Sequence, residues 1–192
     1  MEHEANGRDP ALPMRLGRTT LYESFWVTLH RDRVLLPTGR VLEAYHVLDL
    51  GPGAVVVLVL NEWGEVLLER VARYPTGAAS WELPAGGIDA GEGALEAARR
   101  EVREETGYDS TDHRLLCTYH PLNGISGLQV HVVACQAGRE AGGIDRDEVA
   151  EIRWFTRPEL AGLLARHEIT DGLALIGLLL HLRECGDGPP AA

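Results

Sequence analysis

Residues 82–108 read ELPAGGIDAGEGALEAARREVREETGY, and this segment carries more structural information than any other part of the chain. Apolar residues recur there with helical spacing, which predicts one amphipathic helix over about residues 93–106. On such a helix Glu101 and Glu105 lie one turn apart with Glu104 beside them, so three carboxylates share one face. The opposite face is apolar and consists of Leu95, Ala98 and Val102.

The clustered carboxylates have two interpretations. They can form a solvated face of the helix whose repulsion is relieved by neighbouring arginines, or they can bind a divalent cation. Gly86 and Gly87 precede the helix and Gly107 follows it, so main-chain carbonyls can approach the acidic face closely. Hard oxygen ligands are those that Mg²⁺ or Mn²⁺ requires, and magnesium sites commonly work with substrate phosphates. The pattern therefore favours a Mg²⁺ (or Mn²⁺) site.

Composition restricts the partners of the protein. The chain has 192 residues, of which 45% are hydrophobic and 24% are charged, as is typical of one folded domain with a small appendage. Its formal net charge of -11 argues against nucleic acid and against an anionic membrane surface, because both bind basic faces. An acidic protein that binds an anion needs local arginines or a bridging metal ion. We therefore expect no nucleic-acid partner and no membrane partner.

The cysteines and the N-terminal residues favour a cytoplasmic location. Cys117, Cys135 and Cys185 are widely spaced and form no CxxC pair, so we expect reduced thiols and neither a disulfide framework nor a zinc site. The first residues are acidic and lack the apolar segment of a signal peptide. The apolar run at residues 173–182 is too short to span a membrane.

The order of the elements predicts an α/β (α+β) fold with a mixed sheet. Residues 54–60, AVVVLVL, form a continuous apolar run, which is typical of a strand covered on both faces. Further strands are expected at 25–30, 33–36, 41–50, 65–69, 114–120, 128–136 and 151–155. Further helices are expected at 157–166 and 170–183.

The glycines and proline at residues 51–53 mark a boundary between two parts of the chain. The expected parts are a flexible arm (1–17), an N-terminal β module (18–52), a main domain (53–185) and a tail (186–192).

Within residues 86–108, one set of residues has the spacing of a known motif. The set consists of Gly86, Glu92, Arg100, Glu101, Val102, Glu104, Glu105, Gly107 and Tyr108. It resembles the complete Nudix box, GX5EX7REUXEEXGU, in which U is a bulky apolar or similar residue. The resemblance implies a Nudix-type α/β/α sandwich with a mixed sheet. It also implies hydrolysis of a nucleoside diphosphate linked to another group.

The resemblance also implies roles for individual residues. Glu101 and Glu105 match the main metal ligands of the family, and Glu104 matches a further ligand or a group that orients water. Ala85 would offer its main-chain carbonyl to a metal ion. The remaining matched positions are structural in the family: Gly86, Glu92, Arg100 and Gly107, with Glu92 and Arg100 as a salt-bridging pair.

Features outside the box resemble the branch of ADP-ribose and nucleoside-diphosphate-sugar pyrophosphatases. The RYP run at 73–75 and the WELPAG run at 81–86 carry this similarity. They imply substrate contacts from Arg73 and Glu82, and the β module implies a homodimer with exchanged domains, in which Trp26 contributes to the base pocket. The alternatives are that Trp26 is an interface or core residue and that Arg73 is an exposed charge at a strand end.

The general base and the exact substrate stay open at this point. In the branch, a mobile glutamate before the strand at 151–155 resembles Glu148 and acts as general base, whereas Glu104 is the alternative. The chain lacks the acidic residue that the branch often has near Ser126. The expected reaction releases a nucleoside monophosphate and a sugar phosphate. The alternatives are a nucleotide-pool enzyme acting on triphosphates, an enzyme for another nucleotide conjugate, and a non-catalytic nucleotide-sensing module.

Overall fold

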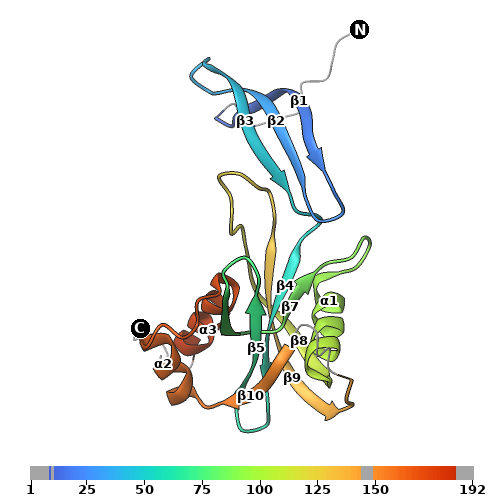
Figure 1. Ribbon diagram of the computed structural model, residues 1–192, viewed down its shortest axis with the longest axis vertical. Helices are drawn as coiled ribbons and strands as arrows, with labels where there is room; N and C mark the ends of the chain where they lie inside the picture. Colours follow the sequence, from blue (N-terminus) through green and yellow to red (C-terminus); the bar gives the residue numbers. More distant parts are fainter. Residues whose placement is uncertain (1–8, 10, 144–148, 185–192) are drawn as a thin grey trace. The chain divides into compact units, whose positions relative to one another are not determined.

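A computed structural model describes residue 9 and residues 11–143 and 149–184. These residues form two compact units. The smaller unit comprises the chain up to Gly51 together with Leu122–Leu128, and the larger unit comprises Pro52–Pro121 and the chain from Gln129 onward. Figure 1 shows the smaller unit with its blue strands and the larger unit as a sheet accompanied by helices.

The smaller unit is an antiparallel sheet in the order β1-β2-β3. Its strands are β1 (Met14–Glu23), β2 (Thr28–Leu35) and β3 (Val41–Asp49). Arg18 Nε and Nη2 donate to the two carboxylate oxygens of buried Asp32 at 2.7 and 2.8 Å, which lowers the pKa of Asp32. Leu48 of β3 donates its N–H to the carbonyl of Ile125 at 2.8 Å, so the segment 122–128 lies along this edge of the sheet.

The strands of the smaller unit differ from the sequence prediction. The predicted strands at 25–30 and 33–36 are parts of the single strand β2, and Trp26 lies in the bend before it. Strand β1 is missing from the prediction and begins at Met14, inside the segment expected to be a flexible arm (1–17). The alternation of apolar residues in β1 stops after Met14 and Leu16, and two register shifts interrupt its pairing with β2, so the sequence shows no sustained strand pattern.

The larger unit is built on a mixed sheet in the order β10-β5-β4-β9-β8, with β6 paired to β5 and β7 paired to β4. Its strands are β4 (Ala54–Leu60), β5 (Val66–Arg73), β6 (Ala78–Glu82), β7 (Ala85–Gly87), β8 (Tyr108–Tyr119), β9 (Val130–Glu140) and β10 (Val149–Phe155). Strand β4 runs parallel to β9, and its other pairings are antiparallel. Its central residues are buried on both faces, as the apolar run predicts.

Helices cover both faces of this sheet (Figure 1). Helix α1 (Ala94–Glu101) packs Ala97 and Ala98 against the face of β4 that carries Val55 and Val57. Helices α2 (Arg157–Ala165) and α3 (Gly172–Glu184) follow β10. The other face, which carries Val132, is covered by α3, where a Cβ on Gly177 would lie 2.6 Å from Leu83 and 3.8 Å from Val132. The arrangement confirms the predicted α/β/α sandwich.

The segment predicted as one helix over 93–106 contains two kinds of helix. The α-helix α1 ends at Glu101, and a π-helical turn, η1 (Val102–Thr106), follows. Gly107 ends the turn in the left-handed conformation with φ 73°, which a glycine adopts without strain. The prediction that Leu95 lies on the buried face is wrong, because this side chain is exposed and Ala97 is buried instead. Strands β6 and β7 lie where the prediction has only a glycine-rich loop.

Two further sequence features were expected to matter for location and redox state. Among the described helices, none is long and apolar enough to cross a membrane. Cys117 and Cys135 are free thiols, and burial raises the pKa of Cys135 to about 12. Cys185 lies outside the described residues.

Candidate active site

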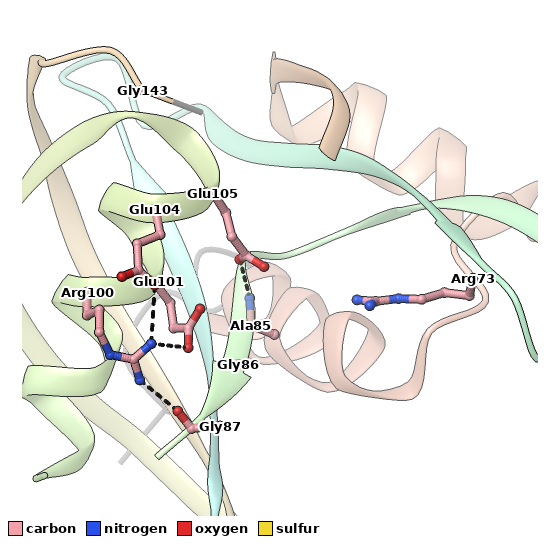
Figure 2. Close-up of a pocket in the computed structure, with 9 residues that line it drawn as sticks. All are labelled: Arg73, Ala85, Gly86, Gly87, Arg100, Glu101, Glu104, Glu105 and Gly143. Carbon is pink, nitrogen blue, oxygen red and sulfur yellow. Dashed lines mark hydrogen bonds and ion pairs between the residues drawn. The ribbon is translucent and has the colours of Figure 1, made fainter. Parts of the chain in front are cut away.

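The larger unit contains a cavity of about 700 Å³ between η1, β7 and the end of β5. It is lined by Arg73, Ala85, Gly86, Gly87, Arg100, Glu101, Glu104, Glu105 and Gly143 (Figure 2). Seven of these nine residues come from the segment 82–108, because β7 and the helical stretch that follows it fold back against each other. The cavity therefore lies where the sequence places the acidic cluster.

The contact between β7 and α1 depends on the absence of a side chain at Gly86. A Cβ built on Gly86 would lie 2.0 Å from Glu101 Oε1 and 2.2 Å from its carboxyl carbon, which is closer than atoms can approach. Glycine is required at position 86 because the Glu101 carboxylate occupies the space of a side chain there. The φ angle of Gly86 does not impose this requirement.

The next residue along β7 makes a direct bond to the other buried acid. Ala85 N–H donates to Glu105 Oε2 at 2.9 Å. Bonds from Ile88 N to Gly53 O at 3.0 Å and from Val57 N to Pro84 O at 2.8 Å mark the hydrogen-bonded rungs between β7 and β4. In an antiparallel pair, residues that exchange hydrogen bonds with the partner strand alternate with residues that do not. Ala85 is of the second kind, so its N–H and C=O both point away from β4. Its carbonyl therefore faces the side on which Glu105 lies.

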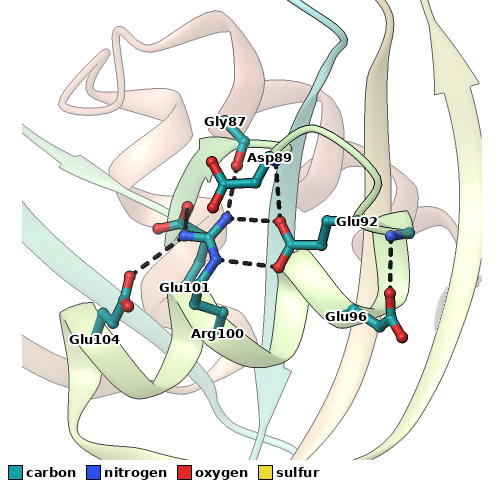
Figure 3. Close-up of polar contacts among 8 residues, drawn as sticks. Gly87, Asp89, Glu92, Glu96, Arg100, Glu101 and Glu104 are labelled. Carbon is teal, nitrogen blue, oxygen red and sulfur yellow. Dashed lines mark hydrogen bonds and ion pairs between the residues drawn. The ribbon is translucent and has the colours of Figure 1, made fainter.

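Arg100 is the centre of the polar contacts beside the cavity (Figure 3). Its Nε and Nη2 donate to the two oxygens of Glu92 at 3.1 and 2.9 Å, and Nη2 also donates to the carbonyl of Gly87 at 2.8 Å. Its Nη1 donates to Glu101 Oε1 at 2.7 Å and to Glu104 Oε2 at 3.3 Å. These partners raise the pKa of Arg100, and the bond from Arg100 lowers the pKa of Glu92.

The three acids of the cluster do not have the same environment. Glu101 and Glu105 are 8% and 6% exposed, whereas the side chain of Glu104 is 58% exposed. The sequence prediction of three carboxylates on one helix face therefore needs a correction, because two of them face β7 and the third faces solvent at the rim. Among the described residues, no three acidic, histidine or cysteine side chains converge closely enough to hold a metal ion by themselves.

The far wall of the cavity carries Arg73, whose guanidinium extends towards Ala85 in Figure 2. Arg73 Nε and Nη2 both donate to Glu82 Oε2, at 3.2 and 2.8 Å, and Ser80 Oγ donates to Glu82 Oε1 at 2.9 Å. Glu82 is 4% exposed and is absent from the cavity lining. Glu82 thus contacts Arg73 in this structure, and its contact with the substrate stays a prediction.

Two more residues were expected in the site. Trp26 belongs to the smaller unit, where it is 80% exposed and packs edge-on against Phe25 with ring centroids 5.1 Å apart. Glu148 lies outside the described residues.

Reasoning from sequence missed the roles of three residues in the cavity or behind its wall. Gly87 was noted only for the close approach of its backbone, and its carbonyl accepts a hydrogen bond from Arg100, which a search for acceptors near the box could have found. Ser80 is recognisable only from the register of β5 and β6, and Gly143 has no sequence signal that we can identify.

Comparison with known proteins agrees with this geometry. The model of the NUDIX domain matches residues 50–174. The chain is 33% identical over 165 residues to the CMP-5'-(N-acetyl-N-hydroxy-3-aminopropyl)phosphonate hydrolase of Streptomyces rubellomurinus, covering 85% of this chain and 79% of that protein. It is 31% identical over 164 residues to the ADP-ribose pyrophosphatase of Mycobacterium tuberculosis, covering 83% of this chain and 78% of the relative.

A solved structure described as an ADP compounds hydrolase shares the fold. The two superpose with a TM-score of 0.78 at 22% identity, over 90% of this chain and 93% of that one. The family match covers the larger unit from β4 into α3 and includes the whole acidic cluster. The resemblance of residues 86–108 to the Nudix box is thereby confirmed, and the chain belongs to the Nudix family.

Proposed function

We propose that this protein is a divalent-metal-dependent pyrophosphatase that cleaves the diphosphate bond of ADP-ribose or a related nucleoside diphosphate sugar. The products are a nucleoside monophosphate and a sugar phosphate. The observation that carries the proposal is the pair of buried carboxylates, Glu101 and Glu105, held against β7 in a cavity with an arginine on each side. The ADP-ribose pyrophosphatase among the relatives supports the choice of substrate class.

The donor set of the cavity fits Mg²⁺ or Mn²⁺. Glu101, Glu105 and the Ala85 carbonyl would hold the ion, with Glu104 at the rim as a further ligand. All of these donors are oxygen atoms, which suit hard cations. The space beside Gly86 supports the fit, because the Glu101 carboxylate lies where any other residue would place a Cβ. A bound ion would supply positive charge to the diphosphate and lower the pKa of a water molecule.

The residues of the chain then bind the substrate and move one proton. Arg73, on the far wall, would contact the diphosphate, and Arg100 would orient Glu101. Water attacks one phosphorus, its oxygen stays on that phosphate, and the bridging oxygen leaves with the other phosphate. The proton of the water goes to a carboxylate, for which we propose Glu148, with Glu104 as the alternative.

A second substrate class is favoured by one relative. The Streptomyces protein, at 33% identity, is named for a CMP-linked phosphonate, which is a nucleotide conjugate without a sugar on its distal side. The absence of an acidic residue near Ser126 in this chain agrees with a distal group other than ribose. The same acids and arginines would serve this substrate, because the cleaved linkage is again a phosphoanhydride.

The proposed activity can be tested with a substrate panel. Purified protein with Mg²⁺ is incubated with ADP-ribose, other nucleoside diphosphate sugars, a CMP-linked phosphonate and nucleoside triphosphates, and released monophosphate is measured by chromatography. We expect turnover of the diphosphate conjugates and loss of all turnover with EDTA. Preferential turnover of triphosphates, or equal turnover in EDTA, would contradict the proposal.

Glu101→Gln and Glu105→Gln should each lower turnover by about 10²-fold or more, because each removes a proposed metal ligand and even groups that only orient such ligands are worth about 10–100-fold. Each change removes one charge from the cavity, while a glutamine at 105 can still accept the Ala85 N–H. Mn²⁺ binding, followed by electron paramagnetic resonance, should weaken in parallel. Glu96→Gln on the same helix is the control, because Glu96 bonds only the N–H of Gly93 among the contacts described for it. Unchanged Mn²⁺ binding in both variants would exclude the metal assignment.

The choice of general base has its own test. Glu148→Gln should lower kcat by about 10²-fold with little change in KM, because proton transfer is an interaction of the transition state. Metal affinity should persist in this variant and should fall in Glu104→Gln. A Glu148→Gln enzyme with normal kcat would leave the role to Glu104 or to a metal-activated water without a carboxylate base.

We also propose that the smaller unit joins two copies of the chain. Most of the large apolar side chains that are exposed in the single chain belong to this unit: Leu12, Met14, Leu16, Leu21, Tyr22, Phe25, Trp26, Tyr45, Leu122 and Ile125. A three-stranded sheet needs a covered apolar face to be stable. A homodimer through residues 18–52 would bury the members of this set that lie in that range, namely Leu21, Tyr22, Phe25, Trp26 and Tyr45.

Leu21→Arg should weaken this dimer by about tenfold or more, as the loss of a central interface side chain does. The measurement is mass by light scattering over a dilution series. Leu179→Arg in α3 is the matched control, because Leu179 is similarly exposed but lies in the larger unit. Wild-type protein that stays monomeric at high concentration would refute the dimer.

A further inference from the structure

The wall of the cavity that carries Arg73 is built from two neighbouring strands. β5 and β6 are antiparallel, with Val71 opposite Ser80 and Glu69 opposite Glu82. The side chains of Glu69, Glu82 and Ser80 are buried, and Arg73 at the end of β5 is half exposed at the cavity. One side of the Arg73 guanidinium therefore lies against buried polar groups, and the other side faces the cavity.

Both oxygens of Glu82 are engaged by groups of this chain. Oε1 accepts the hydroxyl of Ser80 at 2.9 Å, and Oε2 accepts Nε and Nη2 of Arg73 at 3.2 and 2.8 Å. Because Nε and Nη2 bind on one edge of the guanidinium, the opposite group, Nη1, is directed away from Glu82. Glu82 thus fixes the direction in which Arg73 presents its remaining donors.

Arg73 has other carboxylates close enough to affect it. The bond to Glu82 raises the pKa of Arg73 most, and the charges of Glu69 and Asp171 raise it further. Burial raises the pKa of Asp171, the charge of Glu82 adds to this rise, and Arg73 opposes it. Arg73 is thus affected by the charges of three carboxylates, of which Glu82 accepts its hydrogen bonds.

The bond from Ser80 restrains the Glu82 carboxylate. The carboxyl torsion of a glutamate is broad and weakly restrained. A hydroxyl on Oε1 restrains it and leaves Oε2 as the oxygen presented to Arg73. Without that hydroxyl, Oε1 would lose a donor in a buried place, which is unfavourable, and the carboxylate would be free to turn. Arg73 could then move towards Glu69 or Asp171.

We propose that Ser80 is a positioning residue for substrate binding, which acts through Glu82 to hold the Arg73 guanidinium against the cavity. The proposal rests on the proposed function in one respect, namely that Arg73 contacts the diphosphate. Ser80 itself does not touch the cavity.

The kinetic test compares Ser80→Ala with Ser80→Thr, which keeps the hydroxyl and suits a strand. Ser80→Ala should raise KM for the preferred diphosphate about tenfold, the effect of losing one hydrogen bond to a charged group, with little change in kcat. Ser80→Thr should restore KM. Ser110→Ala is the control, because Ser110 is a buried strand serine that bonds His113 away from the cavity.

A double-mutant cycle separates positioning from a general effect on the fold. In an Arg73→Ala background, Ser80→Ala should add nothing further to KM, because the group that it positions is gone. An equal effect in both backgrounds, or a KM of Ser80→Ala within twofold of wild type, would overturn the proposal.

A spectroscopic measurement keeps this test independent of the activity. The Arg73 Nε–H, identified by its loss in Arg73→Lys, should give a protected ¹H–¹⁵N signal in the wild type, in Ser80→Thr and in Ser110→Ala, and should lose protection in Ser80→Ala. If the wild type cleaves no substrate of the panel, the proposed function is wrong. The Arg73 Nε–H signal then still tests whether Ser80 positions Arg73. An unchanged Arg73 Nε–H signal in Ser80→Ala would overturn the positioning role of Ser80.

Discussion

The site depends on the close approach of the Glu101 carboxylate to the backbone of Gly86. The carboxylate occupies the space in which a side chain at position 86 would begin, so the helix and β7 can meet only with glycine there. That approach brings η1 within reach of β7, where the N–H of Ala85 binds Glu105. Two acids are thus buried beside a main-chain edge whose carbonyl faces them. Arg100 stabilises this arrangement of acids, because it donates hydrogen bonds to Glu101, Glu104 and Glu92. It also donates to the carbonyl of Gly87.

The charges of the cavity favour a cation as part of the working site. Arg100 and Arg73 are the basic residues in its lining, and each is already bonded to carboxylates of the chain. Their positive charge is largely balanced, so they orient neighbouring groups more than they attract an anion. The chain as a whole carries a formal net charge of -11. A diphosphate bound to such a surface needs additional positive charge, which a divalent ion between the carboxylates would supply.

The two units differ in how much of their apolar surface they bury. The larger unit buries β4 between α1 on one face and α3 on the other, and its core is complete within one chain. The smaller unit buries polar groups, such as the ion pair of Arg18 with Asp32, while large apolar side chains remain at its surface. A sheet of this kind gains stability only when another surface covers it. This contrast is the physical reason for proposing that the smaller unit is an interface.

The family, the acids of the cluster and the central strand were predictable from the amino-acid sequence. These features depend on short spacings: the fixed intervals from Gly86 to Gly107, and the unbroken apolar run of β4. Strand β1 was not predictable, because its apolar alternation stops after Leu16 and register shifts interrupt its pairing. The three-dimensional packing was needed to show that Glu101 and Glu105 face β7 while Glu104 faces solvent, since a wide π turn follows Glu101 and the helix packs on its alanine face. It also decided that Glu82 binds Arg73 and Ser80, because these contacts are set by the register between β5 and β6 and no local spacing in the sequence encodes that register.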